Sequence, residues 1–249
     1  RKKSTPLVDT AWEIAYDQFV LPASGKVWNG KPSEAGKTTF EVDENTGALK
    51  SLCLDGEELL ASPVTISLFR PATDNDNRDR MGAKLWRKAG LHTLTQKVVS
   101  LKESKTSATA QVNILNVTGK KVGDATLEYT LNHNGSLKVQ TTFQPDTTWV
   151  KSIARLGLTF EMNDTYGNVT YLGRGEHETY IDRNQSGKIG IYTTTPEKMF
   201  HYYVIPQSTG NRTDVRWVKL ADDSGKGCWI ESDSPFQFSA LPFSDLLLE

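Results

Sequence analysis

The chain has 249 residues, and 29 Lys and Arg stand against 30 Asp and Glu, so its formal net charge is −1. This balance, without a dense basic block beyond Arg1-Lys2-Lys3, argues against a nucleic-acid partner. No apolar run approaches the roughly 18 residues that a membrane helix needs, so the sequence also predicts no membrane partner.

The N-terminal stretch differs in composition from the rest of the chain. Within residues 1–22, the segment 10–19 (TAWEIAYDQF) is typical of a strand, and residues 23–36, which contain Gly, Lys and Ser, are typical of a linker. The charged start continues without a small-residue cleavage site, so we identify no signal peptide. We expect residues 37–249 to form one large domain.

From residue 38 onwards, most of the sequence alternates between apolar and polar residues, which is the period of a half-buried strand. Asp55-Gly56 and Asn134-Gly135 are hairpin turn signals, because these residues tolerate the positive φ angles of primed turns. A spacing of about ten residues between strands indicates a sandwich or barrel. Strands are predicted at 38–42, 48–54, 93–101, 106–116, 124–132, 136–143, 154–162, 169–172, 215–220, 227–231 and 236–239.

Helix signals are scarce. Residues 78–89 are the strongest candidate, because Met81, Leu85 and Ala89 fall on one face and Gly90 would end the helix. The sequence therefore predicts an all-β fold of antiparallel sheets with one short helix.

The two cysteines, Cys53 and Cys228, could form at most one disulfide. Each lies in an alternating apolar run, where a buried free thiol is the commoner state, so we expect free thiols. The sequence contains no HExxH, CxxC, EF-hand loop, GxSxG, phosphate loop or dinucleotide fingerprint. We therefore predict no metal site and no cofactor.

Two acidic clusters could carry chemistry. In the first, Asp74, Asn75 and Asp76 would fold back on the backbone as Asx-turns leading into the helix at Arg78, with a sugar- or metal-facing role as the alternative. In the second, the close alternation of acidic and basic residues around Asp182 favours an internal ion-pair network, with ligand contact as the alternative. The second cluster consists of Glu176, His177 and Glu178.

Histidine and tryptophan offer further candidates. His177 is flanked by carboxylates, so its imidazole could carry a proton. Exposed tryptophans can stack on sugar rings, but packing in a sandwich core is the commoner role for Trp28, Trp86, Trp149 and Trp217.

Three motifs, taken in their order and spacing, resemble one known family. They are residues 68–76 (LFRPATDND), 85–91 (LWRKAGL) and 171–183 (YLGRGEHETYIDR), which follow the pattern RPxxDND, a Trp about ten residues on, and GxGxxExYxDR. They resemble the C-terminal, small-chain domain of β-galactosidases of glycoside hydrolase family 2, over residues 37–243. Residues 11–22 resemble the last strand of the immunoglobulin-like domain that precedes it.

This resemblance implies a large antiparallel β-supersandwich similar to galactose mutarotases. Both catalytic carboxylates of the family belong to a separate (β/α)₈ barrel, so this chain is expected to be non-catalytic, with that barrel and a β-galactoside as partners. The loop of residues 74–82 could approach the galactosyl site. The substrate-binding candidates are Asp74, Asn75, Asp76, Arg78, Trp86, Glu176, His177 and Glu178.

The sequence also departs from the family pattern. It stops before the family's GGDxSW segment, so we expect a C-terminally truncated sandwich whose open edge could promote homo-oligomerisation. Two alternative functions stay open: a mutarotase-like epimerase, with His177 or His201 opposite a carboxylate, and a carbohydrate-binding module with coplanar exposed aromatics. The sequence fits a bacterial protein that is periplasmic, secreted or cytoplasmic.

Overall fold

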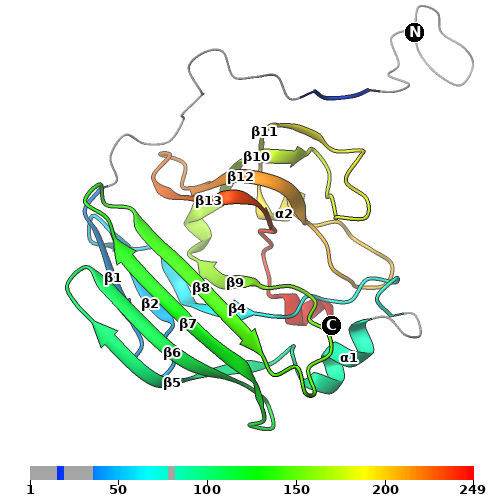
Figure 1. The fold of residues 1–249 in the computed structure, drawn as a ribbon. Helices are drawn as coiled ribbons and strands as arrows, with labels where there is room; N and C mark the ends of the chain where they lie inside the picture. The colour runs from blue at the N-terminus through cyan, green and yellow to red at the C-terminus, as the bar shows by residue number, and fades with distance from the viewer. Residues whose placement is uncertain (1–15, 20–35, 78–81) are drawn as a thin grey trace, which may run out of the picture.

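The computed structural model describes residues 16–19, 36–77 and 82–249. Antiparallel strands dominate these ranges, which confirms the all-β prediction (Figure 1). Most of the predicted N-terminal strand and the linker, together with Arg78 and Trp28, lie outside the described residues. In the part of the chain that is described, no helix is long and apolar enough to cross a membrane.

The first sheet has the order β1-β2-β4-β9, with β3 paired to β2. Asp55 and Gly56 have φ angles of 54° and 84°, as the predicted primed turn requires. The strand that the Asp55-Gly56 hairpin predicts after the turn is divided into β3 and β4. β4 contains Pro63, and here the register with β9 shifts, so that a proline is tolerated. The strands are β1 (Thr38–Val42), β2 (Leu49–Leu54), β3 (Glu57–Glu58), β4 (Leu60–Ser67) and β9 (Gly157–Met162).

The second sheet has the order β5-β6-β7-β8. The predicted hairpin at Asn134-Gly135 joins β7 to β8, but only Gly135 takes a positive φ, of 79°. Gly135 N donates to the Asn132 carbonyl at 3.0 Å, so this turn is not of the primed type that we expected. The strands are β5 (Leu94–Glu103), β6 (Ser107–Asn116), β7 (Lys121–Leu131) and β8 (Leu137–Pro145).

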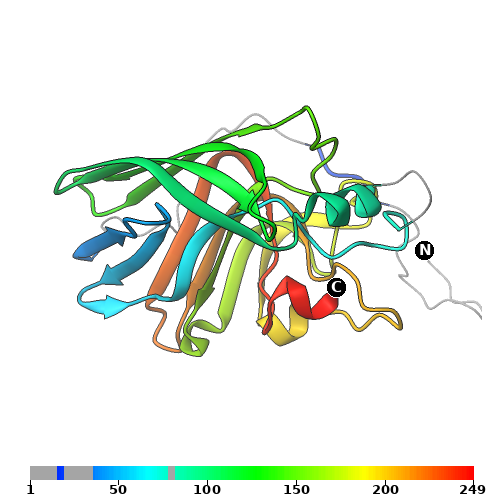
Figure 2. The same cartoon turned by 90° about the horizontal axis from the view of Figure 1, so that it is seen from below.

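These two sheets enclose the main core, and Figure 2 shows β5–β8 lying across the other strands. Leu49 and Ile66 of the first sheet and Ile114 and Leu127 of the second are buried in it. The Tyr129 hydroxyl crosses this core and donates to the Gly47 carbonyl at 2.9 Å. Alternation along each strand therefore places one apolar face of each sheet against the other.

A single main helix, α1 (Gly82–Ala89), lies against the main core. Its described part starts four residues later than the predicted 78–89, because residues 78–81 lie outside the described ranges. Ala83, Trp86 and Ala89 are its buried residues. Trp86 is therefore a core residue, as the commoner role of tryptophan predicts.

The third sheet has the order β11-β10-β12-β13 and its own core around Tyr171, Met199 and Val215. We did not predict β11 or the short helix α2, and β13 is one strand where two were predicted. The elements are β10 (Asn168–Gly175), β11 (Lys188–Thr194), α2 (Pro196–Met199), β12 (Arg212–Ala221) and β13 (Gly227–Phe238), with 3₁₀ turns η1 (Asp164–Tyr166) and η2 (Asp245–Leu248).

Both cysteines are free, as predicted. Burial raises the pKa of the Cys228 thiol to about 11. Trp217 is buried, and its ring stacks on that of Trp229 with the centroids 4.3 Å apart.

Candidate functional site

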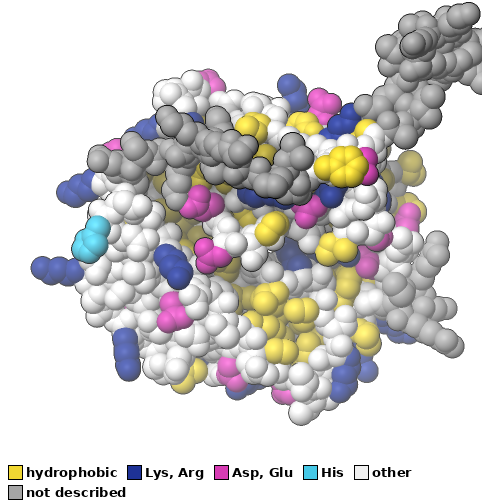
Figure 3. Space-filling view, turned by 45° about the horizontal axis from the view of Figure 1, so that its top comes forward, with side chains coloured by type: hydrophobic (Ala, Val, Ile, Leu, Met, Phe, Trp, Pro, Cys, Tyr) yellow, Lys and Arg dark blue, Asp and Glu magenta, His cyan; other side chains and the backbone are white. Residues whose placement is uncertain are grey.

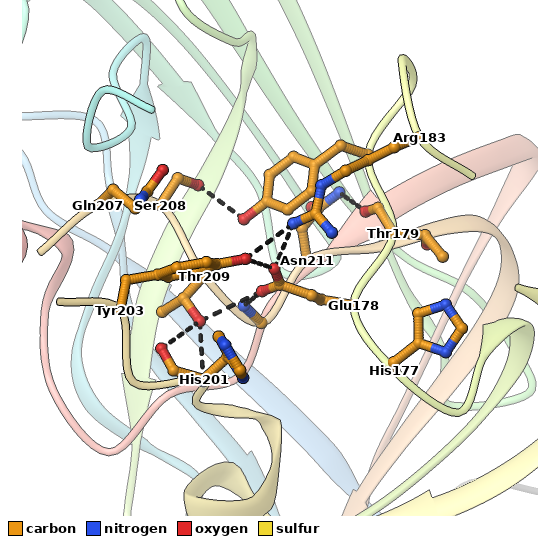
Figure 4. Close-up of polar contacts among 12 residues, drawn as sticks. His177, Glu178, Thr179, Arg183, His201, Tyr203, Gln207, Ser208, Thr209 and Asn211 are labelled. Atoms are coloured by element: carbon orange, nitrogen blue, oxygen red, sulfur yellow. Dashed lines mark hydrogen bonds and ion pairs between the residues drawn. The ribbon is translucent and has the colours of Figure 1, made fainter. Parts of the chain in front are cut away.

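Three segments that are distant in sequence meet in what we call the loop cluster: residues 70–77, 176–187 and 200–211. Figure 4 shows contacts between the second and third segments. The third segment bonds to the other two. Gln207 Oε1 accepts from Asp74 N at 3.4 Å, and the Tyr180 hydroxyl donates to Ser208 Oγ at 3.1 Å. The structure thus brings the two acidic clusters of the sequence together through the segment 200–211. From the sequence, His201 was the one candidate residue in that segment.

Glu178 lies at the centre of the loop cluster and is 8% exposed. Its Oε1 accepts from the Tyr203 hydroxyl and from the Arg183 guanidinium, and its Oε2 accepts from Gly210 N at 2.8 Å (Figure 4). Burial acts to raise the pKa of Glu178, but the hydrogen bonds from Tyr203, Gly210 and Arg183 outweigh it and hold the pKa below its ordinary value. Glu178 is therefore an ionised carboxylate, and both of its oxygens accept hydrogen bonds from neighbouring residues.

Of the internal ion-pair network predicted around Asp182, the described residues show one pair within the segment and one pair that leaves it. Arg183 pairs with Glu178, and Arg174 pairs with Asp214, whose residue lies on β12. The Arg183 guanidinium also lies 4.9 Å from the centroid of the Tyr180 ring. Charged and aromatic groups therefore fasten the segment after β10 to its neighbours.

The other two candidates of this segment are exposed. His177 Nε2 lies 2.8 Å from Ser186 Oγ, a contact within the same loop. The Glu176 side chain is exposed, while its backbone carbonyl accepts from Arg212 at 3.1 Å, and the Gly175–Glu176 peptide bond is cis. Only the backbone of Glu176 is thus fixed by a buried group.

Arg212, the first residue of β12, borders the loop cluster and was not among the predicted site residues. It is 3% exposed and donates to the Tyr171 hydroxyl at 2.8 Å and to the carbonyls of Gly210, Asn211 and Glu176. A buried guanidinium must find such acceptors. The strand predicted at 215–220 did not include Arg212. No motif in the sequence indicated that Arg212 would be a buried hydrogen-bond donor.

Asp76 bonds back to Thr73 of its own loop, whereas the predicted Asx-turn would use the N–H of residue 78, which lies outside the described residues. Its Oδ2 lies 2.6 Å from Arg70 Nη1 and accepts from Thr73 N at 2.9 Å and from the Thr73 hydroxyl at 2.7 Å. Burial acts to raise the pKa of Asp76, but the bonds from Arg70 and Thr73 lower it below the ordinary value. Asp74 and Asn75 remain exposed at the loop tip.

Trp86 lies behind this loop rather than on the surface. It is 5% exposed, its Nε1 donates to Ser152 Oγ at 3.0 Å, and the Arg70 guanidinium lies 5.4 Å from its ring centroid. Trp86 therefore contacts the loop cluster through Arg70, and its ring is not exposed for a sugar to stack on.

A hollow of about 210 Å³ opens beside the loop cluster. The His201 ring packs edge-on against Tyr203 there, with the centroids 4.6 Å apart. Within the described ranges, no three His, Cys, Asp or Glu side chains are grouped so as to hold a metal ion. The hollow is lined by Phe200, His201, Tyr202, Tyr203, Pro206, Gln207, Phe243, Leu247 and Leu248.

Comparison with known proteins matches residues 34–249 to the family model described as beta galactosidase small chain. A beta-galactosidase from Priestia megaterium is 31% identical over 97% of this chain and 25% of its own length. Beta-galactosidase BgaC from Bifidobacterium adolescentis is 28% identical over 94% of this chain and 23% of its own. The corresponding values for a beta-galactosidase from Kluyveromyces lactis are 27%, 95% and 25%. The chain thus spans about a quarter of the length of these relatives.

Proposed function

The chain belongs to the beta galactosidase small chain family, and on that premise we propose that it is a non-catalytic domain of a β-galactosidase. The parent enzyme would hydrolyse terminal β-D-galactosides with retention of configuration. Its other domains, which would include the catalytic barrel, are the partners that we propose for this chain. The matched quarter of each relative leaves ample length for such domains.

The observation that carries the non-catalytic role is the state of Glu178. Retaining hydrolysis needs two carboxyl groups about 5 to 5.5 Å apart, and one of them must hold a proton at working pH because its pKa is raised. The pKa values of Glu178 and Asp76 are instead held below their ordinary values, and each carboxylate is paired with an arginine. Such groups suit the stabilisation of loops better than proton transfer.

Exposure divides the substrate-binding candidates into two groups. Asp74, Asn75 and His177 have exposed side chains, and we assign them to direct contact with the galactoside or with the barrel mouth. The less exposed candidates would hold the loops in place; these are the buried Glu178 and Trp86, the half-buried Asp76 and the backbone of Glu176. Arg78 belongs to the same proposal by its place in the loop of residues 74–82.

Apolar surface is consistent with a domain that packs against others. On the face drawn in Figure 3, hydrophobic side chains gather in one area with charged side chains around it. Tyr202, Val204 and Ile205 of the loop cluster are also exposed. Contiguous exposed apolar areas are typical of interaction surfaces.

Activity assays test the proposal. The purified 249-residue chain is incubated with nitrophenyl-β-galactoside, with α-galactose in a polarimeter, and with galactose in a calorimeter. We expect no turnover by the chain alone, and we expect turnover when it is co-expressed with the remaining domains of a β-galactosidase. Turnover by the chain alone would overturn the non-catalytic role.

The same assays distinguish the two other functions. Accelerated mutarotation would instead support an epimerase that uses His177 or His201. Saturable binding of galactose without turnover, and without dependence on other domains, would support a carbohydrate-binding module.

A further inference from the structure

The strand β11 lies at one end of its sheet, with β10 as its neighbour on one side. In an antiparallel pair, the backbone groups of alternate residues point towards the partner and away from it. Ile189 bonds on the side away from β10, so the N–H and C=O groups of Ile191 and Thr193 point to that side as well. The edge of β11 therefore offers a row of strand-pairing groups.

The side chain of Gln18 occupies one position of this row. Gln18 Nε2 donates to the Ile189 carbonyl at 3.0 Å, and Ile189 N donates to Gln18 Oε1 at 2.6 Å. A carboxamide carries the same donor and acceptor as a peptide group, so Gln18 bonds to Ile189 as a neighbouring strand would.

Tyr16 supports the same contact. Its hydroxyl donates to the Gln185 carbonyl, and Lys188 Nζ lies 4.6 Å from the centroid of its ring. Residues 16–19 thus contact Gln185, just before β11, as well as Lys188 and Ile189, the first two residues of β11.

The β11 edge lacks the features by which other edge strands avoid pairing. Natural edges carry charges, prolines or bulges that obstruct an incoming strand. β13, at the opposite end of the same sheet, contains Glu231, Asp233 and Pro235 and has two register shifts against β12. β11 (KIGIYTT) contains one charged residue, no proline and no register shift against β10.

We propose that residues 16–19 cap the β11 edge against pairing with a second copy of this chain, with Gln18 occupying the backbone groups that an incoming strand would use. The cap is a property of the 249-residue chain and does not depend on the proposed enzymatic role. Removal of the Gln18 side chain opens the edge, and two β11 strands can then pair across it.

The test compares Gln18→Ala with the unchanged chain and with Gln140→Ala, which removes an exposed glutamine from β8 in another sheet. We expect the Ile189 amide of Gln18→Ala to exchange its hydrogen about fivefold faster in dilute solution, as loss of one hydrogen bond predicts. Light scattering over a concentration series should show more self-association for Gln18→Ala than for the other two. Unchanged Ile189 exchange or unchanged self-association would overturn the proposal.

A double variant identifies the surface involved. Ile191 is 50% exposed, and a lysine at this position places a charge on the edge. Gln18→Ala combined with Ile191→Lys should return to the association state of the unchanged chain. Self-association that persists in the double variant would contradict a β11 interface. Exchange rates in β6 and β7 serve as the control for an intact fold.

Discussion

Replacement of Glu178 by glutamine removes the charge at the centre of the loop cluster while it keeps the size of the side chain. The variant loses the ion pair with Arg183 and weakens the bonds from Tyr203 and Gly210 N. Breaking a buried ion pair costs about 3 to 5 kcal/mol, but Arg183 is half exposed and keeps part of its hydration. We therefore expect a loss of about 2 kcal/mol, from the lower range for charged hydrogen bonds.

Thermal unfolding at pH 7 measures this loss, and in a chain of this size it corresponds to a midpoint lower by about 4 to 8 °C. Asp182→Asn is the matched control, because Asp182 is an exposed acid of the same loop; its effect should stay within about 0.5 kcal/mol. A Glu178→Gln midpoint equal to that of Asp182→Asn would refute the structural role of Glu178.

The pH dependence of the stability difference between Glu178→Gln and the unchanged chain gives a second readout. Because the folded state lowers the pKa of Glu178, its contribution is present above the unfolded value of 4.5 and is lost as the pH falls through the folded pKa. The difference between Glu178→Gln and the unchanged chain should be full at pH 7 and should narrow below pH 4.5. A difference that widens with acid would contradict the assigned sign.

Three more changes have defined outcomes. Trp86→Ala should lower the free energy of unfolding by about 3 to 5 kcal/mol, because it leaves a cavity in the core and removes the bond to Ser152; a loss below about 1 kcal/mol in urea unfolding would place Trp86 outside the core. Asp76→Asn should cost about 1 to 2 kcal/mol by weakening the pair with Arg70, and its effect should disappear in acid; an effect constant from pH 7 to pH 3 would argue against an ionised Asp76. Cys228, with its thiol pKa raised to about 11, should react with iodoacetamide at pH 8 much more slowly in the folded chain than in urea; equal rates by mass spectrometry would contradict its burial.

The sequence predicted the strands whose alternation is a local property. β5 to β8 each place one face on the main core, and their side chains alternate accordingly. The strand after the Asp55-Gly56 turn was predicted without bounds, and Pro63 in β4 is tolerated only through a register shift against β9, a strand about ninety residues away in the chain. The turn at Asn134-Gly135 was placed correctly, but its type depends on how β7 and β8 approach each other.

In the candidate site, too, contacts within one loop were easier to predict than contacts between distant segments. The contacts of Asp76 with Arg70 and Thr73 lie within one loop, and the sequence predicted a carboxylate folded back on that loop but not these two partners. The bonds of Glu178 to Tyr203 and Gly210 join residues 25 and 32 positions apart, which no local pattern encodes. The motif resemblance identified Glu178 as a candidate, whereas its role in holding the loops emerged only from the tertiary contacts.

We propose that this chain is a non-catalytic domain of a β-galactosidase, and hydrolysis of nitrophenyl-β-galactoside by the purified 249-residue chain tests this proposal most directly. We expect a rate equal to that of buffer for the chain alone, and turnover when the remaining domains of a β-galactosidase are supplied by co-expression. Hydrolysis by the chain alone that is abolished in Glu178→Gln or Asp76→Asn would contradict it, because these carboxylates would then be catalytic.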